Sequence, residues 1–251
     1  MSSDVSVSVC VATYNGSRFV RHQLQSILDE LHADDEVVVV DDASTDDTAD
    51  IVASFDDTRI RLIRAPRNRG YVRTFEAALS AARGDVIFLS DQDDEWVAGR
   101  RALLVAALRD RAIAAGDLVL LPDGAPLTSP LTGRPWRLKP LPSGGSVGNE
   151  LRLLAGNAPY YGCAMAFRAD AAPLLLPFPE FLVESHDLWM ATVGNTAREL
   201  AHVRQPVTRR RLHDANASAP RPRGVGAALR SRWMLIRAWR EARRRLRTHR
   251  R

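Results

Sequence analysis

Three carboxylates follow one apolar segment of the chain within four residues. Asp91, Asp93 and Asp94 come directly after residues 86–90, a run typical of a buried strand. An α/β sheet binds its ligands at the carboxyl ends of its strands, and carboxylates so close together repel one another unless a cation lies between them. A solvated acidic turn is the alternative, because short acidic patterns arise easily in a chain with 30 Asp and Glu residues. The position of the cluster between a strand and a helix favours a cation site.

Two other acidic groups lie at comparable positions. Asp42 follows the apolar run 36–40, and Glu184 and Asp187 lie where a helical pattern begins. The carboxyl ends of parallel strands share one edge of a sheet, so we expect Asp42 and Asp91 to lie along the same edge. The chain contains neither G-x-G-x-x-G nor G-x-x-x-x-G-K-[ST]. A divalent cation held by one or two carboxylates would therefore be needed to neutralise a bound diphosphate.

The elements that position these acids alternate between strands and helices. Apolar runs predict strands at residues 5–12, 36–40, 60–64 and 85–90, and helical spacing predicts helices at 18–31, 47–55 and 71–82. This alternation predicts an α/β fold with a mainly parallel, doubly wound sheet flanked by helices. The later pattern predicts helices at 96–114, 150–155 and 185–197, strands at 118–121 and 160–168, and an extended segment at 203–212. Residues 122–148 hold six Pro and five Gly, which predicts an irregular excursion over the active face.

The composition predicts one catalytic domain and a basic tail. Of 35 basic residues, 12 lie at positions 221–251 beside a single acid, so the remaining 220 residues carry a formal net charge of −6. We expect a domain at 1–220, with a nucleotide-sugar half at 1–115 and an acceptor half at 116–220, and a separate tail at 221–251. Cys10 and Cys163 are too few for a disulfide framework, and no apolar run reaches the roughly 18 to 20 residues of a membrane span. The start of the chain has no secretory pattern, so we expect a cytoplasmic protein.

Several motifs occur in the order of a known family. The chain resembles glycosyltransferase family 2, which has the GT-A (Rossmann-like) fold. The segments that resemble its nucleotide-binding half are residues 9–16, 38–48, 68–70 and 91–94. Those that resemble its acceptor half are Asn157 and residues 162–168, 186–189 and 211–216. The form Ser-Asp-Gln-Asp-Asp at 90–94 and His-Asp-Leu-Trp at 186–189 are most similar to a rhamnosyltransferase-like branch. The resemblance implies a metal-dependent inverting transfer of a hexose, with dTDP-L-rhamnose or a UDP-sugar as donor and a saccharide or lipid-linked acceptor in cell-envelope or exopolysaccharide synthesis.

The resemblance also implies roles for residues on the donor side. Thr13 and Tyr14 would line the base and ribose pocket, Asp42 would accept from the pyrimidine N3–H, Asp91 would lie near the ribose, and Arg69 belongs to the same donor-binding set. Asp42 has an alternative role as a helix cap.

On the diphosphate side, the resemblance implies that Asp93 binds Mn²⁺ or Mg²⁺. His213 would reach the metal or the diphosphate, with a surface or packing role as its alternative. Asp94 is expected to point outward or cap a helix, and one arginine of residues 209–211 is expected to touch the diphosphate.

On the acceptor side, Asp187 matches the position of the family's catalytic base. His186 competes with it on chemical grounds, because the ordinary pKa of histidine is nearer neutrality. Glu184 would orient the acceptor or cap the helix. Trp189 would stack on an acceptor sugar, unless it packs in the core with Met190.

Two alternatives to a membrane-binding helix stay open for the tail. Tryptophan and arginine at helical intervals after Gly224 predict an amphipathic helix on an anionic membrane surface, where lipid-linked acceptors are found. The alternatives are a solvated basic tail and a nucleic-acid arm, and we expect no nucleic-acid partner.

Two alternatives also stay open for the whole protein. A nucleotidyltransferase would carry a glycine-rich basic loop after the first strand, whereas a silent nucleotide-sugar-binding scaffold at the membrane would not need both Asp93 and Asp187.

Overall fold

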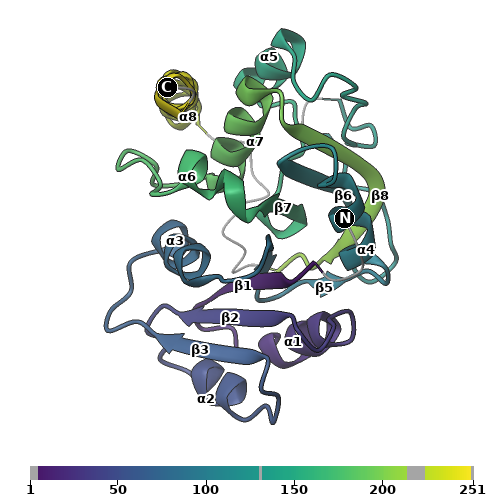
Figure 1. Ribbon diagram of the computed structural model, residues 1–251, viewed down its shortest axis with the longest axis vertical. Helices are drawn as coiled ribbons and strands as arrows, with labels where there is room; N and C mark the ends of the chain where they lie inside the picture. The colour runs from purple at the N-terminus through teal and green to yellow at the C-terminus, as the bar shows by residue number, and fades with distance from the viewer. Residues whose placement is uncertain (1–4, 130–131, 214–223, 250–251) are drawn as a thin grey trace.

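In the described part of the chain, eight strands form one sheet with helices on both faces (Figure 1). The computed structural model describes residues 5–129, 132–213 and 224–249. The strands are β1 (Val7–Thr13), β2 (Glu36–Asp41), β3 (Ile60–Arg64), β4 (Val86–Asp91), β5 (Glu95–Trp96), β6 (Ile113–Leu120), β7 (Met165–Arg168) and β8 (Leu200–Arg210). The helices are α1 (Val20–Leu28), α2 (Thr48–Ala53), α3 (Tyr71–Ala81), α4 (Arg100–Ala107), α5 (Val147–Ala155), α6 (Ala172–Leu175), α7 (His186–Ala197) and α8 (Val225–His249), with 3₁₀ turns η1 (Gly162–Ala164) and η2 (Ala169–Ala171).

The order of the strands creates a ligand-binding edge. It runs β3-β2-β1-β4-β7-β6-β8-β5, and the first four strands pair in parallel, which confirms the predicted parallel sheet. β7 is antiparallel to both β4 and β6, while β6 and β8 are parallel. The chain leaves β1 toward β2 on one side and later returns to β4 on the other. The carboxyl ends of β1 and β4 therefore form the switch point at which open α/β sheets bind ligands.

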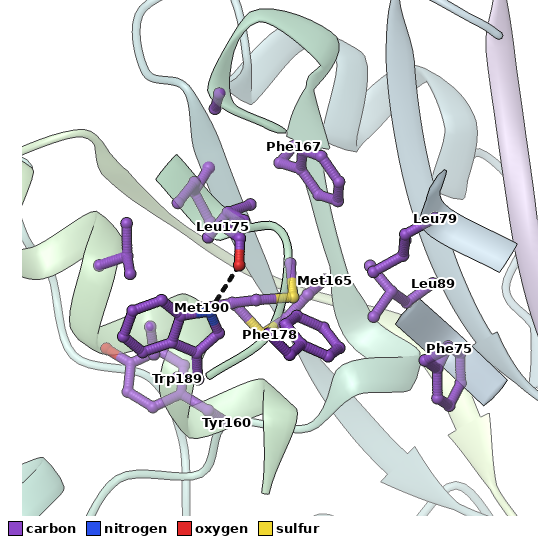
Figure 2. Close-up of a cluster of buried hydrophobic side chains, with 14 of the residues drawn as sticks. Phe75, Leu79, Leu89, Tyr160, Met165, Phe167, Leu175, Phe178, Trp189 and Met190 are labelled. Atoms are coloured by element: carbon purple, nitrogen blue, oxygen red, sulfur yellow. Dashed lines mark hydrogen bonds between the residues drawn. The ribbon is translucent and has the colours of Figure 1, made fainter. Parts of the chain in front are cut away.

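The core consists of two apolar layers on opposite faces of the sheet. Successive strand side chains point to opposite faces, so Val7, Val9 and Val11 pack with α1 and α4, while Cys10 packs with α3 on the other face. The second layer extends under α7, where aromatic and sulfur-containing side chains fill the space (Figure 2). The sequence pattern of near-continuous apolar strands follows from this two-sided burial.

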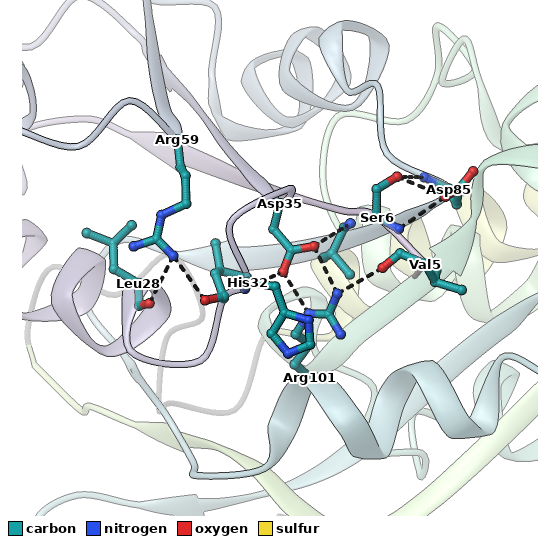
Figure 3. Close-up of polar contacts among 10 residues, drawn as sticks. Val5, Ser6, Leu28, His32, Asp35, Arg59, Asp85 and Arg101 are labelled. Atoms are coloured by element: carbon teal, nitrogen blue, oxygen red, sulfur yellow. Dashed lines mark hydrogen bonds and ion pairs between the residues drawn. The ribbon is translucent and has the colours of Figure 1, made fainter. Parts of the chain in front are cut away.

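The amino ends of the strands are joined by a buried ion pair (Figure 3). The Asp35 carboxylate accepts hydrogen bonds from Arg101 Nε at 2.7 Å and Nη2 at 2.9 Å, and from the backbone N–H groups of Val7 and His32 at 2.8 Å each. These contacts tie the start of α4 to the starts of β1 and β2. They stabilise the sheet at the end opposite the switch point.

Two predicted elements differ from the structure. The helix predicted at 96–114 ends at Ala107, and residues 113–120 form β6 instead. Alanine is the strongest helix former, but helix propensity is small beside tertiary packing, and the burial of Ala114 and Ala115 in the sheet between β7 and β8 overrides it. Gly116 fits here because a Cβ would lie 2.4 Å from a methyl group of Val207 on β8. The strand predicted at 160–168 is shorter, since η1 precedes β7.

The basic tail forms helix α8, but its apolar stripe is used inside the protein. Met234, Leu235 and Ala238 are buried, and α8 contacts α5, α6 and α7. Arg245 adds a hydrogen bond from Nη2 to the carbonyl of Pro177 at 2.7 Å. This corrects the interpretation of the whole apolar stripe as a membrane-facing surface. Among the described residues, no helix combines the length and the apolar character needed to cross a membrane.

Candidate active site

A cavity of about 620 Å³ lies at the switch point and joins the two halves of the chain. It is lined by eight of the residues predicted for the site: Thr13, Tyr14, Asp42, Asp91, Asp93, Glu184, His186 and Asp187. The lining comes from loops after β1, β2 and β4 and from the start of α7. Tyr71 connects the halves, because its hydroxyl accepts a hydrogen bond of 3.0 Å from the backbone N–H of Ser185. Arg69, Trp189 and His213 do not line the cavity.

The loop after β1 is held by Gln92. The Gln92 side chain accepts from the backbone N–H of Tyr14 at 2.9 Å and donates to its carbonyl at 3.0 Å. Gly16 leaves room for the Gln92 side chain, since an added Cβ would lie 2.2 Å from Gln92 Oε1 and displace it. Tyr14 remains 45% exposed, whereas Thr13 is buried and donates to Asp41 at 3.0 Å. The arrangement leaves the Tyr14 ring free of the core at the mouth of the cavity, where a flat base can pack against it.

Asp42 organises the neighbouring loop. Its two carboxylate oxygens accept from the backbone N–H groups of Arg69 and Gly70, each at 2.9 Å. Each oxygen retains a second lone pair for a ligand N–H. The predicted alternative of a helix cap is wrong for Asp42, since its oxygens bond the 69–70 loop. Arg69 joins the site through its backbone, and its side chain is exposed outside the cavity.

Burial and mutual repulsion perturb the acid cluster after β4. Burial raises the pKa of Asp91 well above its ordinary value, and the neighbouring Asp94 and Asp93 charges raise it further. Burial, followed by the Asp93 charge, raises the pKa of Asp94 to about 6. Asp94 is only 2% exposed and accepts from the backbone N–H of Arg211 at 3.0 Å. The prediction that Asp94 points outward is therefore wrong, because the chain folds β8 over it.

Two buried arginines face these acids. Arg100 is fully buried; it donates from Nη2 to the carbonyl of Leu89 at 2.8 Å, and burial lowers its pKa to about 10. Arg210 lines the cavity and places its guanidinium 4.6 Å from the centre of the Tyr161 ring. The sequence indicated one arginine among 209–211, and Arg210 is the one in the cavity. Arg100 and Tyr161 were missed, because no motif marks a buried arginine or an aromatic residue whose partner lies about 50 residues away.

Asp93 and His213 meet, although they lie 120 residues apart. His213 Nε2 is 2.7 Å from Asp93 Oδ2, and the imidazole stacks on Phe19 with ring centroids 4.7 Å apart. Carboxylate oxygen and imidazole nitrogen form a donor set that suits Mn²⁺, and carboxylate alone suits Mg²⁺. Asp94 Oδ2 is buried without a hydrogen-bond partner among the described residues, which adds an acidic oxygen nearby. The residues therefore fit a divalent cation.

The nearby thiol does not suit a hard cation. Cys163 lies in a cluster with Asp91 and Asp94 whose potential ligand atoms are within 4.8 Å of one another. Burial raises the pKa of the Cys163 thiol well above its ordinary value, so the sulfur stays protonated. Mn²⁺ and Mg²⁺ prefer oxygen ligands. Of the groups in this cluster, the carboxylates are the ones that suit a hard cation.

The two base candidates on α7 are separated by their surroundings. His186 packs against Phe75 with ring centroids 4.5 Å apart, and neither ring nitrogen has a hydrogen-bond partner among the described residues. Burial lowers the pKa of His186 to about 4. Burial raises the pKa of Asp187 to about 6, against the opposing hydrogen bond from the Leu188 N–H at 2.8 Å. Asp187 is thus the stronger base, which reverses the order of the ordinary pKa values.

The remaining acceptor-side predictions have different outcomes. Glu184 lines the cavity next to Ser185, as an acceptor-orienting residue must. Trp189 is fully buried, and its indole N–H donates to the carbonyl of Leu175 at 3.0 Å (Figure 2). The prediction that Trp189 stacks on a sugar is wrong, because the ring is enclosed by the core beneath α7. The predicted motif residues Asp214 and Asn216 lie outside the described residues.

A mixed sheet of this order with an acidic cavity at its switch point is a GT-A fold, and solved structures share it. S. aureus TarS in complex with UDP-GlcNAc has a TM-score of 0.67 at 20% identity, covering 84% of this chain and 60% of that one. The mannosyltransferase PcManGT from Pyrobaculum calidifontis, in complex with GDP-Man and Mn²⁺, has a TM-score of 0.60 at 19% identity, covering 96% and 74%. At these identities the likeness shows the fold.

The sequence comparison shows the family. Residues 8–172 match the model of glycosyl transferase family 2, which is more than half of the 251 residues. The chain belongs to glycosyltransferase family 2. WfaP of Escherichia coli, named as a UDP-Glc:alpha-D-GlcNAc-diphosphoundecaprenol beta-1,3-glucosyltransferase, is 35% identical over 91 residues, which are 36% of this chain and 36% of WfaP. The matched segments cover half or less of the length of curated relatives such as TuaG of Bacillus subtilis and ExoO of Rhizobium meliloti. Family membership sets aside the nucleotidyltransferase alternative.

Proposed function

We propose that this protein is a metal-dependent inverting glycosyltransferase that moves a hexose from a nucleoside diphosphate donor to a saccharide or lipid-linked acceptor in envelope or exopolysaccharide synthesis. The observation that carries the proposal is the single cavity shared by Asp42, Asp93 and Asp187. It offers a group for a base N–H, a group for a diphosphate-bound cation and a group for an acceptor proton. A silent nucleotide-sugar-binding scaffold would need only the first two.

On the donor side, Tyr14 and Thr13 border the nucleoside, and Asp42 accepts from a ring N–H. Bound at Asp93, Mn²⁺ or Mg²⁺ would stabilise the negative charge that develops on the leaving diphosphate. Arg210 contributes a second positive charge from β8, where it faces Asp91 across the cavity. Uracil and thymine carry an N3–H that Asp42 can accept, so we propose a UDP-sugar or dTDP-L-rhamnose, and the UDP-Glc named for WfaP favours the first.

On the acceptor side, Asp187 removes the proton of the attacking hydroxyl. A pKa of about 6 leaves the carboxylate ionised at neutral pH and still basic enough to accept a proton as attack proceeds. Asp187 lies in the first turn of α7 and Asp93 follows β4, so the base and the cation ligand reach one cavity from different elements. In an inverting transfer they would act on opposite sides of the transferred carbon. Glu184 lies beside Asp187 in the lining and orients the acceptor.

We also propose that the outward face of α8 rests on an anionic lipid surface. Leu229 and Trp233 are 65% and 56% exposed, and the helix continues with the exposed arginines 237, 240, 243, 244 and 247. An apolar start followed by cations suits a headgroup layer. The lipid-linked acceptor named for WfaP supports such a location.

Point substitutions test the lipid proposal better than deletion of residues 222–251, which would uncover the apolar core beneath α8. Arg240→Glu with Arg247→Glu should reduce flotation with anionic vesicles and leave neutral vesicles unaffected. Arg83→Glu with Arg109→Glu, which makes the same charge change elsewhere on the surface, is the matched control. Equal recovery of the two double variants would refute the proposed surface.

A thermal-shift panel tests the proposed activity. UDP-, dTDP- and GDP-sugars are compared with and without Mn²⁺, because a ligand that binds the native state raises its apparent stability. We expect a shift with a pyrimidine nucleotide sugar that increases with Mn²⁺. A protein that binds none of these donors is not the proposed enzyme.

A further inference from the structure

A second cavity of about 230 Å³ lies beside the active site in the acceptor half. Its walls come from Ser129, Thr132 and residues 134–139, from α5 and the loop after it, and from His202 on β8. The volume is below that of pockets that enclose a whole small ligand, so it suits one chemical group of a larger one. Part of the proline-rich segment 122–148 thus forms one wall of this cavity.

The charge of this second cavity is entirely positive. Arg134, Arg137, Lys139 and Arg152 line it, and no acidic residue does so. None of the four side chains forms an ion pair within the described ranges 5–129, 132–213 and 224–249. Four cations without an acid are unexpected in residues 1–220, because this part of the chain carries a net negative charge. One of the four, Lys139, is the single lysine of the chain. The cations therefore concentrate a positive potential at one concave site.

The floor of the cavity is a rigid neutral network. The carbonyl of Lys139 can only accept, so His202 Nδ1 donates to it at 2.5 Å. His202 Nε2 then accepts from the Tyr160 hydroxyl at 2.7 Å, and Asn149 donates to that hydroxyl at 2.8 Å. Burial lowers the pKa of His202, which keeps the ring neutral. The network holds Lys139 and α5 in place without contributing a charge of its own.

One donor in the wall lacks an acceptor. The indole Nε1 of Trp136 is buried and has no hydrogen-bond partner among the residues described. An unpaired buried N–H is costly, and a ligand oxygen that reached it would recover that cost. Two carboxyl groups lie next to residues of the lining: Asp117 accepts from the backbone N–H of Leu138 at 2.8 Å, and Glu150 accepts from the side-chain amide of Asn195 at 2.7 Å. Neither carboxyl group lines the cavity itself, and burial raises the pKa of both.

The second cavity is adjacent to the active-site cavity. Tyr160 lines the basic cavity and Tyr161 the catalytic one, and the Cα atoms of consecutive residues are only about 3.8 Å apart. Trp136 packs edge-on against Tyr161 with ring centroids 6.4 Å apart. A single elongated acceptor can therefore contact both cavities, with its hydroxyl at Asp187 and another group among the arginines.

We propose that this basic cavity is an acceptor subsite that binds an anionic oxygen group, a phosphoryl or carboxylate, carried by the acceptor. The inference rests on the proposed glycosyl transfer and adds the class of acceptor, one with a negative charge near the sugar that is glycosylated. Arg137 and Arg152 pair with the anion, and the indole of Trp136 lies in the wall beside them.

Calorimetric titration of the full chain tests the subsite with three probes: glucose 1-phosphate, methyl glucoside and inorganic phosphate. EDTA is present throughout, because the acids at Asp93 repel a phosphate when no cation is bound. We expect glucose 1-phosphate to bind at least tenfold more tightly than methyl glucoside. Arg137→Gln with Arg152→Gln should weaken that binding at least tenfold, while Arg83→Gln with Arg109→Gln should change it less than twofold.

Two results would overturn the inference. Equal binding by the two double variants would show that the cavity is not the anion site. Inorganic phosphate binding as tightly as glucose 1-phosphate would show a free-ion site and not an acceptor subsite. The donor thermal-shift panel, run on the same variants, should be unchanged. Failure of that panel with the wild-type protein would refute the glycosyltransferase proposal while leaving anion binding to be judged on its own.

Discussion

Replacing Asp187 with asparagine should make the protein less active and more stable at neutral pH. In the folded state, burial raises the pKa of Asp187 from 3.8 to about 6. The folded protein therefore holds this proton to higher pH than the unfolded chain, and stability falls as pH rises from about 4 to about 6. Above pH 6 the full cost is present, at most about 3 kcal/mol at 1.36 kcal/mol per pH unit. The asparagine side chain of the variant does not titrate and escapes this cost.

The measurement is thermal unfolding of both proteins at pH 4 and pH 7.5. At pH 7.5 the variant should unfold up to about 6–12 °C higher, since 1 kcal/mol corresponds to about 2–4 °C for a chain of this size. At pH 4 the difference should nearly vanish, because both side chains are then uncharged. Other buried acids titrate in both proteins and cancel in the comparison. Asp170→Asn, at an exposed position, is the control and should show no pH-dependent gain.

The activity of the same variant tests the catalytic role. Loss of a general base should lower kcat by about 10²–10⁴, with the donor-induced thermal shift retained. In the wild type, kcat/KM should fall below about pH 6 as Asp187 takes up a proton. His186→Gln should keep this acid limb, because the pKa of His186 is already near 4. Turnover by the Asp187→Asn enzyme within tenfold of wild type, or no stability gain at pH 7.5, would refute the reasoning.

Three further changes probe the metal, the loop after β1 and the C-terminal helix. Asp93→Asn should abolish the Mn²⁺-dependent part of the donor thermal shift, and an unchanged shift would exclude Asp93 as a ligand. Gly16→Ala should weaken donor binding with little loss of stability, because its Cβ displaces only the flexible end of Gln92; unchanged affinity would contradict this. Leu235→Ala should lower the unfolding free energy by about 2–5 kcal/mol in denaturant titrations, whereas the exposed control Leu229→Ala should change it by less than about 0.5 kcal/mol.

Prediction succeeded where neighbours in sequence share one strand. The runs that became β1, β2 and β4 are apolar on both faces, so their burial, their parallel pairing and the acids at their ends could be predicted from the pattern. Asp42, Asp91 and Asp93 reached one cavity because parallel strands end at one edge. The resemblance to the family predicted that Asp187 would lie at the same site, although no local pattern connects α7 to β4.

Prediction failed where a side chain depends on a distant surface. The sequence does not distinguish a tryptophan that contacts a sugar from one that packs in the core. Only the packing of α6 and α7 shows that Trp189 is enclosed. Asp94 is turned inward by Arg211, which lies 117 residues away. The alanines of β6 favour a helix locally, and the sheet overrides them.

The sequence by itself determined which residues can do chemistry and along which edge most of them lie, since strand periodicity and short motifs are local properties. The tertiary structure decided the rest. It made Asp187 a stronger base than His186, because the two side chains are buried in different surroundings, and it docked the apolar stripe of α8 on the protein. It also brought Arg152 of α5 together with the cations of residues 134–139 in one cavity. Burial and long-range charge depend on the whole fold, and no local pattern of residues encodes them.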